Sequence, residues 1–144
     1  MATGARTDPY RDFNFMVEID GITQAGFQEC GGLDSSTDPV DYREGTDPNH
    51  VRKLSGLNKY TALTLKRGIT DSDELWKWRK TVIDGKTERK NGSIILLNEA
   101  GVEKVRWNFL GGWPSKWTGP SLNATGTAVA VETLEITHEE LKKA

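Results

Sequence analysis

Residues 113–120 read Trp-Pro-Ser-Lys-Trp-Thr-Gly-Pro, and residues 128–139 read Ala-Val-Ala-Val-Glu-Thr-Leu-Glu-Ile-Thr-His-Glu. The second segment is rich in β-branched residues and lacks helical periodicity, which predicts a long β-ribbon. Its apolar positions change parity, because Val129 and Val131 are odd whereas Leu134 and Ile136 are even. A change of parity exchanges the two faces of a strand. We therefore expect either a bulge near residues 132–133 or a strand that passes from one buried surface to another.

The tryptophans that precede this ribbon would share one face of a regular strand. Trp113 and Trp117 are four residues apart, so both side chains point the same way in an extended chain. Pro114 lacks the amide hydrogen that a central strand uses, which favours an edge or a bend. We expect the indole rings to pack in the core or against another subunit, and a ligand-stacking pair is the alternative.

Further patterns predict strands and one helix. Phe13, Phe15, Val17 and Ile19 alternate with Asn, Met, Glu and Asp, as in a half-buried strand. The other expected strands cover residues 22–27, 40–44, 60–66, 93–97 and 105–109. A helix is expected over residues 72–83, where apolar residues recur on one face and acidic residues at positions 71 and 74 have capping-box spacing. Residues 1–144 are thus predicted to be a single domain of mainly β (α+β) class, an antiparallel β-barrel or sandwich with one packed α-helix.

The segment between the expected strands near residues 40 and 60 differs in character. Residues 45–59 are polar, contain Pro48 and two glycines, and show no clean period. We expect a long inter-strand loop, and loops of that length in compact domains are usually functional or disordered. A few apolar anchors among charged residues suit a contact that becomes ordered on assembly. The residues expected to make an axial contact with another subunit are Gly45, Asp47, His50, Val51, Arg52, Lys53 and Leu54.

Edge strands of a β-barrel must be protected from uncontrolled pairing. The sequence has several apolar strands and no obvious cap for them, so we expect neighbouring subunits in a ring to satisfy these edges. The residues assigned to strand contacts within such a ring are Phe13, Phe15, Val129, Val131, Leu134 and Ile136. Residues 1–11 are expected to form a flexible N-terminal arm.

Composition narrows the functional classes. The 144 residues contain 19 Lys and Arg against 21 Asp and Glu, so bulk charge does not favour nucleic acid. Cys30 is the single cysteine, which excludes an intrachain disulfide. No apolar run reaches the ~18 residues of a membrane span, and the first residues lack a signal core, so we expect cytoplasmic synthesis without a membrane anchor. His50 and His138 have no close Cys or His partner, so no catalytic pair, metal site or cofactor is predicted.

Several motifs occur in a characteristic order. They are Phe-Asn-Phe-Met-Val-Glu-Ile-Asp-Gly at 13–21, Gly-Phe-Gln-Glu-Cys-Gly-Gly-Leu at 26–33, Asp-Tyr-Arg-Glu-Gly at 41–45, Arg-Lys-Leu-Ser-Gly-Leu at 52–57, Leu-Thr-Leu-Lys-Arg-Gly at 63–68, Gly-Ser-Ile-Ile-Leu at 92–96, Trp-Pro-Ser-Lys-Trp at 113–117 and Glu-Thr-Leu-Glu-Ile at 132–136. In order and spacing, this set resembles the tube proteins of contractile phage tails and of phage-tail-like contractile injection particles.

The resemblance implies a structural, non-enzymatic role. Hexameric rings with a continuous inner barrel would stack into a hollow conduit that is expelled when a surrounding sheath contracts. The implied partners are other copies of the chain, the contractile sheath protein, baseplate or spike proteins, tube-terminating proteins, and cargo proteins or phage DNA in the lumen. In similar proteins a long loop near residues 45–59 contacts the adjacent ring. The assembled phage tail or injection particle is the implied residence.

Two other functions are also compatible with the sequence. One is a tube-initiator subunit of the same fold, which would join the tube to the baseplate spike. The other is a small-molecule-binding β-barrel, which would keep an apolar cavity and separate subunits.

Overall fold

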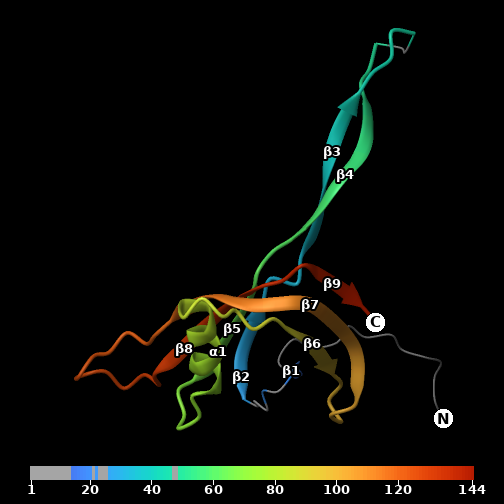
Figure 1. The fold of residues 1–144 in the computed structure, drawn as a ribbon. Helices are drawn as coiled ribbons and strands as arrows, with labels where there is room; N and C mark the ends of the chain where they lie inside the picture. Colours follow the sequence, from blue (N-terminus) through green and yellow to red (C-terminus); the bar gives the residue numbers. More distant parts are fainter. Residues whose placement is uncertain (1–13, 21, 23–25, 47–48) are drawn as a thin grey trace, which may run out of the picture.

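The computed structural model describes residues 14–20, 22, 26–46 and 49–144. Its elements, in chain order, are β1 (Phe15–Ile19), β2 (Phe27–Gly31), β3 (Ser35–Tyr42), β4 (Arg52–Tyr60), β5 (Leu63–Gly68), α1 (Glu74–Ile83), β6 (Lys90–Leu97), β7 (Glu103–Thr118), β8 (Val131–Thr137) and β9 (Glu140–Lys143). Seven strands form one antiparallel sheet in the order β1-β6-β7-β8-β5-β2, with β9 paired to β7. Strands β3 and β4 form a separate two-stranded sheet that projects away from the rest of the molecule (Figure 1).

The larger sheet curves around one apolar core, and α1 packs against its β7 side (Figure 1). The predicted class, mainly antiparallel β with one helix, is confirmed in its sandwich form. The sheet does not close into a barrel within the described chain, because its end strands β1 and β2 are not paired with each other. Among the described residues, the outer edges of β1 and β2 have no strand partner, and only the bridge between Ile19 and Ile22 adjoins β1.

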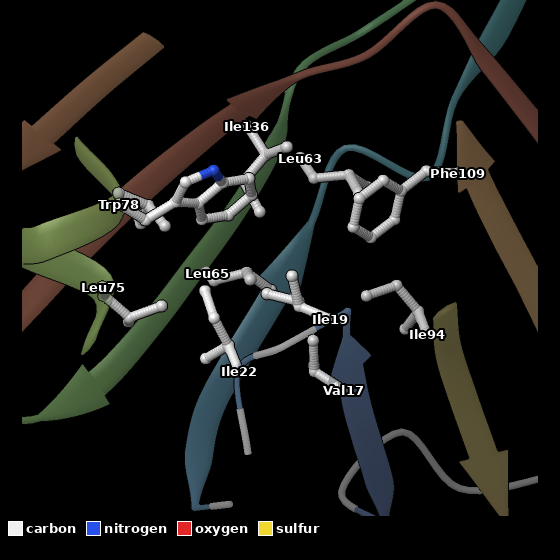
Figure 2. Close-up of a cluster of buried hydrophobic side chains, with 11 residues drawn as sticks. Val17, Ile19, Ile22, Leu63, Leu65, Leu75, Trp78, Ile94, Phe109 and Ile136 are labelled. Atoms are coloured by element: carbon white, nitrogen blue, oxygen red, sulfur yellow. The ribbon is translucent and has the colours of Figure 1, made fainter. Parts of the chain in front are cut away.

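Alternating side chains of β1 point into this core. Val17 and Ile19 are buried whereas Met16 and Glu18 are exposed, as the alternation predicts. Phe13 was expected to extend this strand, and residues 1–11 were expected to form an N-terminal arm. Both lie outside the described residues. Figure 2 shows side chains from β1, β5, β6, β7, β8 and α1 converging on one cluster. Its labelled members are Val17, Ile19, Ile22, Leu63, Leu65, Leu75, Trp78, Ile94, Phe109 and Ile136.

Helix α1 begins two residues later than the sequence indicates. Its N-cap is Asp73, which makes no side-chain hydrogen bond to the helix backbone, so the predicted capping box is wrong. The Asp73 carboxylate instead forms an exposed ion pair with Lys77, one turn along the helix. Leu75 and Trp78 are buried against the sheet as their spacing predicts. The Trp78 indole nitrogen also donates a 2.7 Å hydrogen bond to the carbonyl oxygen of Glu88, which joins α1 to the segment before β6.

Strand β7 changes partner at the predicted proline. Its first part pairs with β6 up to Gly112, and its second part pairs with β8 from Trp113 onward. Pro114 therefore lies where β6 no longer flanks β7, and the register to β8 shifts between Pro114 and Lys116. The free side of this position is occupied by Arg79 of α1, whose Nη1 donates to the Pro114 carbonyl at 3.2 Å. The predicted edge and bend are both confirmed.

The expected irregularity at residues 132–133 is wrong. Strand β8 pairs with β5 in unbroken register from Val131 to Ile136, and its buried side chains are all at even positions. Position 132 is a core position occupied by Glu132, which is 7% exposed, while Val129 precedes the strand and is exposed. The apparent change of parity arises because a charged residue takes an inward position beside two outward-facing valines.

Glu132 is tolerated in the core because its carboxylate is fully engaged. Its Oε1 accepts a 2.5 Å hydrogen bond from Nε of Arg67, which is also buried, and its Oε2 accepts one from the Trp117 indole at 3.2 Å. Nη2 of Arg67 donates to the carbonyl of Ser72, just before α1. A buried ion pair needs such additional hydrogen bonds to offset desolvation. This network joins β5, β7, β8 and the start of α1.

The prediction of a long loop over residues 45–59 is also wrong, because the actual connection is shorter. Residues 52–60 form β4, which pairs with β3 along its length, so only the tip of this segment is a connection. The strand was not recognisable because nearly all its side chains are exposed, and an exposed strand needs no alternation of polar and apolar residues.

Replacing Glu132 by Ala leaves Arg67 buried without its counter-charge. We expect E132A to lower the free energy of unfolding by about 3–5 kcal/mol, measured by chemical denaturation. Glu135→Ala is the matched control, because Glu135 lies on the outer face of the same strand and meets Lys116 only at 4.0 Å. That control should lose less than about 1 kcal/mol. Equal losses in the two variants would show that the buried pair contributes nothing special.

Candidate functional site

One face of the projecting hairpin carries most of its exposed apolar side chains. Val40 lies opposite Leu54 and Tyr42 lies opposite Arg52, so these four side chains share a side of the ribbon. A bulge near Asp38 sets two residues of β4, Gly56 and Leu57, against one of β3. The bulge brings Leu57 onto the apolar face, although its odd number would otherwise place it on the other side. The exposed fractions of this face are Val40 48%, Tyr42 40%, Leu54 47% and Leu57 75%.

Glycine is required at the bulge because the two strands approach closely there. A Cβ atom on Gly56 would lie 2.6 Å from the carbonyl oxygen of Asp38 and 2.9 Å from a methyl group of Val40. Contacts this short do not occur in folded proteins, so any side chain at position 56 would disturb the bulge. The bulge places Leu57 on the side of Val40 and Leu54, so its loss would change which side Leu57 faces.

The opposite face of the hairpin is polar and internally satisfied. The Thr37 hydroxyl donates to the Asn58 side chain at 2.7 Å, and Lys53 forms an ion pair with Asp41. One face of the hairpin is thus polar, and the other presents exposed apolar side chains beside the charged Arg52. A two-stranded hairpin is only marginally stable in water without a packing partner. The apolar face is therefore the strongest candidate for a contact with another molecule, and we call its members, Val40, Tyr42, Leu54 and Leu57, the hairpin patch.

The structure distributes the predicted axial-contact residues over the outer half of the hairpin. Gly45 lies in the turn after β3, and His50 and Val51 precede β4. Arg52, Lys53 and Leu54 begin β4, and Asp47 is outside the described residues. Of these residues only Leu54 belongs to the hairpin patch. Leu57 lies in the segment 45–59 that was expected to supply apolar anchors. Val40 and Tyr42 were missed, and the signal that identifies them is the β3–β4 register, which sequence alone does not reveal.

Two residues assigned to contacts between strands of neighbouring subunits lie in the core instead. Leu134 and Ile136 are 1% and 0% exposed, so their side chains are enclosed within this chain. Phe15 and Val131 are partly buried, and Val129 is 72% exposed. Backbone edges are better placed for such a contact, because within the described chain β6 is the only strand paired with β1 and β5 the only strand paired with β2, apart from a single bridge between Ile19 and Ile22. Unpaired edges of this kind can accept a strand from another molecule.

The root of the hairpin is tightly packed. Gly32, just after β2, has a φ of 87°, and a Cβ atom there would lie 2.1 Å from the carbonyl oxygen of Ala62. On the other side, the ring of His138 lies against Tyr60, the last residue of β4. His138 is only 8% exposed. It continues the inward even positions of β8, and this parity is the sequence signal of its burial.

Chemically reactive groups are sparse in the described part of the chain. No cluster of three or more His, Cys, Asp or Glu side chains there could hold a metal ion. Burial raises the pKa of the Cys30 thiol to about 12, which keeps it in the unreactive protonated form. Among these same residues, no helix has the length and apolar character needed to cross a membrane.

One protein family matches most of the chain. The family described as T4-like virus tail tube protein gp19 matches residues 11–142. No curated protein sequence matches the chain. A chain in the structure of an extracellular contractile injection system, PVC sheath/tube terminator in extended state, is 28% identical, with 97% of this chain and 99% of that chain covered and a TM-score of 0.87.

Two further solved structures are similar over most of their length. A chain of the PVC sheath-tube complex in extended state is 28% identical, with 94% of this chain and 91% of that chain covered and a TM-score of 0.84. A chain of the anti-feeding prophage tube terminating cap is 27% identical, with 99% and 95% covered and a TM-score of 0.85.

Because the hairpin lacks a packing partner, its backbone amides should open locally. In the unassembled chain, we expect hydrogen exchange to be much faster for β3 and β4 than for β5 and β8, whose side chains form the core. Mass spectrometry of pepsin fragments would measure the difference. Equal protection of both regions in a dilute sample would contradict an intrinsically marginal hairpin.

The raised pKa of Cys30 predicts slow alkylation. At pH 8 the folded chain should react with iodoacetamide about a thousandfold more slowly than the denatured chain, because so little thiolate is present. The reaction rate should keep increasing at pH values so high that an ordinary thiol is already fully ionised. Equal rates in the folded and denatured chain would contradict this assignment.

Proposed function

The chain belongs to the T4-like virus tail tube protein family, and from this premise we propose that its copies form hexameric rings that stack into the hollow inner tube of a contractile phage tail or phage-tail-like injection particle. Its role as a structural tube subunit follows from the family and from the likeness to chains of contractile injection systems. The hexameric state, the mode of stacking and the tube contents are the parts that we add.

The observation that carries the proposal is the uncovered hairpin patch. A ring that stacks head to tail needs a contact in which two different surfaces of the subunit meet. The hairpin supplies one such surface, because it extends far from the sheet (Figure 1). It also presents exposed apolar side chains. Its outer residues, Gly45 to Leu54, would meet the adjacent ring together with the hairpin patch. Asp47 is included in this proposal from the sequence alone.

Closure of each ring is a separate contact. The open edges of β1 and β2 support a model in which neighbouring subunits continue the sheet around the ring. Phe15, Val129 and Val131 would pack at this boundary, and Phe13 extends the same strand pattern in sequence. Such continuity would give the tube a lining of paired strands, since no edge would then be left open.

The remaining partners follow from the kind of particle. The similar chains come from assemblies named for sheath, tube and terminator or cap. We propose that this subunit likewise contacts a contractile sheath protein on its outside, and a baseplate or spike protein and a terminating protein at the ends of the tube. The lumen would carry cargo protein or phage DNA. In this role the subunit needs no catalytic group and no cofactor.

A ligand-binding β-barrel is disfavoured by the interior of the sheet. Phe109, Leu63 and Leu65 fill that interior with at most 1% exposure. A barrel that encloses a small molecule keeps this space open. The tube-initiator alternative shares the family and the fold, and it would differ in the length of the homopolymer formed.

Electron microscopy of the purified chain over a concentration series tests the proposal. Leu57→Asp places a charge on the hairpin patch at a position that is 75% exposed, so the fold should tolerate it. We expect six-fold rings to persist and tube formation to require at least about tenfold more protein, because burying leucine contributes about 1.5–3 kcal/mol. Ser55→Asp, on the polar face, is the matched control and should stack normally.

The outcomes separate the parts of the proposal. Tubes that form equally well with Leu57→Asp would exclude the hairpin patch from stacking. Monomers at every concentration, even with preformed tube ends added as templates, would contradict the ring itself. Short stacks that stop after one or two rings would favour the tube initiator over the main tube subunit.

A further inference from the structure

The hairpin is joined to the sheet at one end only. Residues 32–34 lead from β2 into β3, and residues 61–62 lead from β4 into β5. Neither β3 nor β4 pairs with a strand of the larger sheet. The direction of the whole hairpin therefore depends on what holds these two short connections.

One connection is held by His138. The ring of this residue is buried between Tyr60 of β4 and Phe109 of the core, with centroid distances of 5.8 Å and 6.2 Å. Its Nε2 lies 3.1 Å from the carbonyl oxygen of Thr61. A carbonyl only accepts hydrogen bonds, so Nε2 carries the hydrogen and donates it. The bond thus runs from the core sheet to the connection between hairpin and sheet.

His138 is itself held firmly. It lies between β8 and β9, and both neighbours in sequence are fixed by β7. Thr137 pairs with Trp113, and the amide of Glu139 donates to the Leu110 carbonyl at 2.9 Å. The imidazole therefore extends from a rigid part of the sheet, which lets it hold a less rigid one in place.

The other ring nitrogen shows that histidine is not here for packing alone. Nδ1 of His138 is buried and has no hydrogen-bond partner among the described residues. A buried polar atom without a partner costs free energy, and a phenylalanine would fill similar space without that cost. What histidine supplies beyond phenylalanine is the bond to Thr61. The close approach of Gly32 to Ala62 restrains the second connection from the other side.

We propose that His138 is a positioning residue that sets the direction in which the hairpin leaves the sheet. This inference deepens the proposed function and rests on it in one respect, namely that the hairpin direction determines how the hairpin meets the adjacent ring. Without the bond to Thr61 the hairpin pivots about residues 32–34 and 61–62. Stacking must then restrict that motion, which weakens the contact.

The test separates hairpin direction from stacking. Spin labels are placed at Ser55 on the polar face of the hairpin and at Lys104, an exposed residue of β7, in a Cys30→Ser background. Distances between the labels are measured in dilute, unassembled protein. We expect one narrow distance for His138 and for His138→Gln, whose amide nitrogen occupies about the place of Nε2. His138→Phe and the smaller His138→Leu should lose that single distance and show a broad distribution.

Stacking is then scored for the same variants by electron microscopy. His138→Phe and His138→Leu should form rings but few tubes, and His138→Gln should restore tubes. Ile94→Val, which trims the core away from the hairpin root, controls for general loss of packing and should change neither readout. A narrow distance in the apolar variants overturns the positioning role. A broad distance with normal tubes overturns its link to stacking while leaving the proposed tube function intact.

Discussion

A two-stranded ribbon has no interior, so the apolar side of the β3–β4 hairpin can be covered only from outside. This constraint organises the rest of the molecule. The larger sheet buries its own apolar residues around Phe109 and Ile136, so its core is complete within one chain. The hairpin has no such core, and its Leu57 is 75% exposed. A chain with one self-sufficient part and one dependent part is suited to assembly, because association stabilises only the dependent part.

The larger sheet contains a buried ion pair that its sequence does not suggest. Arg67 and Glu132 are both buried, yet they face each other and reach β7 and the approach to α1 through hydrogen bonds. Such a network has directional requirements that apolar packing lacks, so it discriminates between the native pairing of β5 and β8 and a pairing shifted by one residue. The network thereby stabilises α1 and the strands β5 and β8, which lie next to the edge strand β2.

The sequence predicts those parts in which burial repeats with a regular period. The alternation in β1, the buried face of α1 and the bend at Pro114 were all foreseen, because each depends on one local rule. Four features were not foreseen, for physical reasons. Strand β4 is exposed and so carries no periodic signal. Glu132 takes a core position through a partner 65 residues away. His138 is buried by Tyr60, which is remote in sequence. The hairpin patch depends on a bulge that only the register reveals.

The single-ended attachment of the hairpin also makes it a lever. A strand of 8 residues spans about 26 Å at roughly 3.3 Å per residue, so a tilt of about 10° at the root displaces the tip by about 4–5 Å, close to the spacing between neighbouring strands. Angular errors at the root are thus magnified into misplacement by one whole strand at the far end. The straightness of a long assembly therefore depends on the few close contacts at the root of the hairpin. These contacts decide whether small errors in hairpin direction cancel or accumulate from one ring to the next.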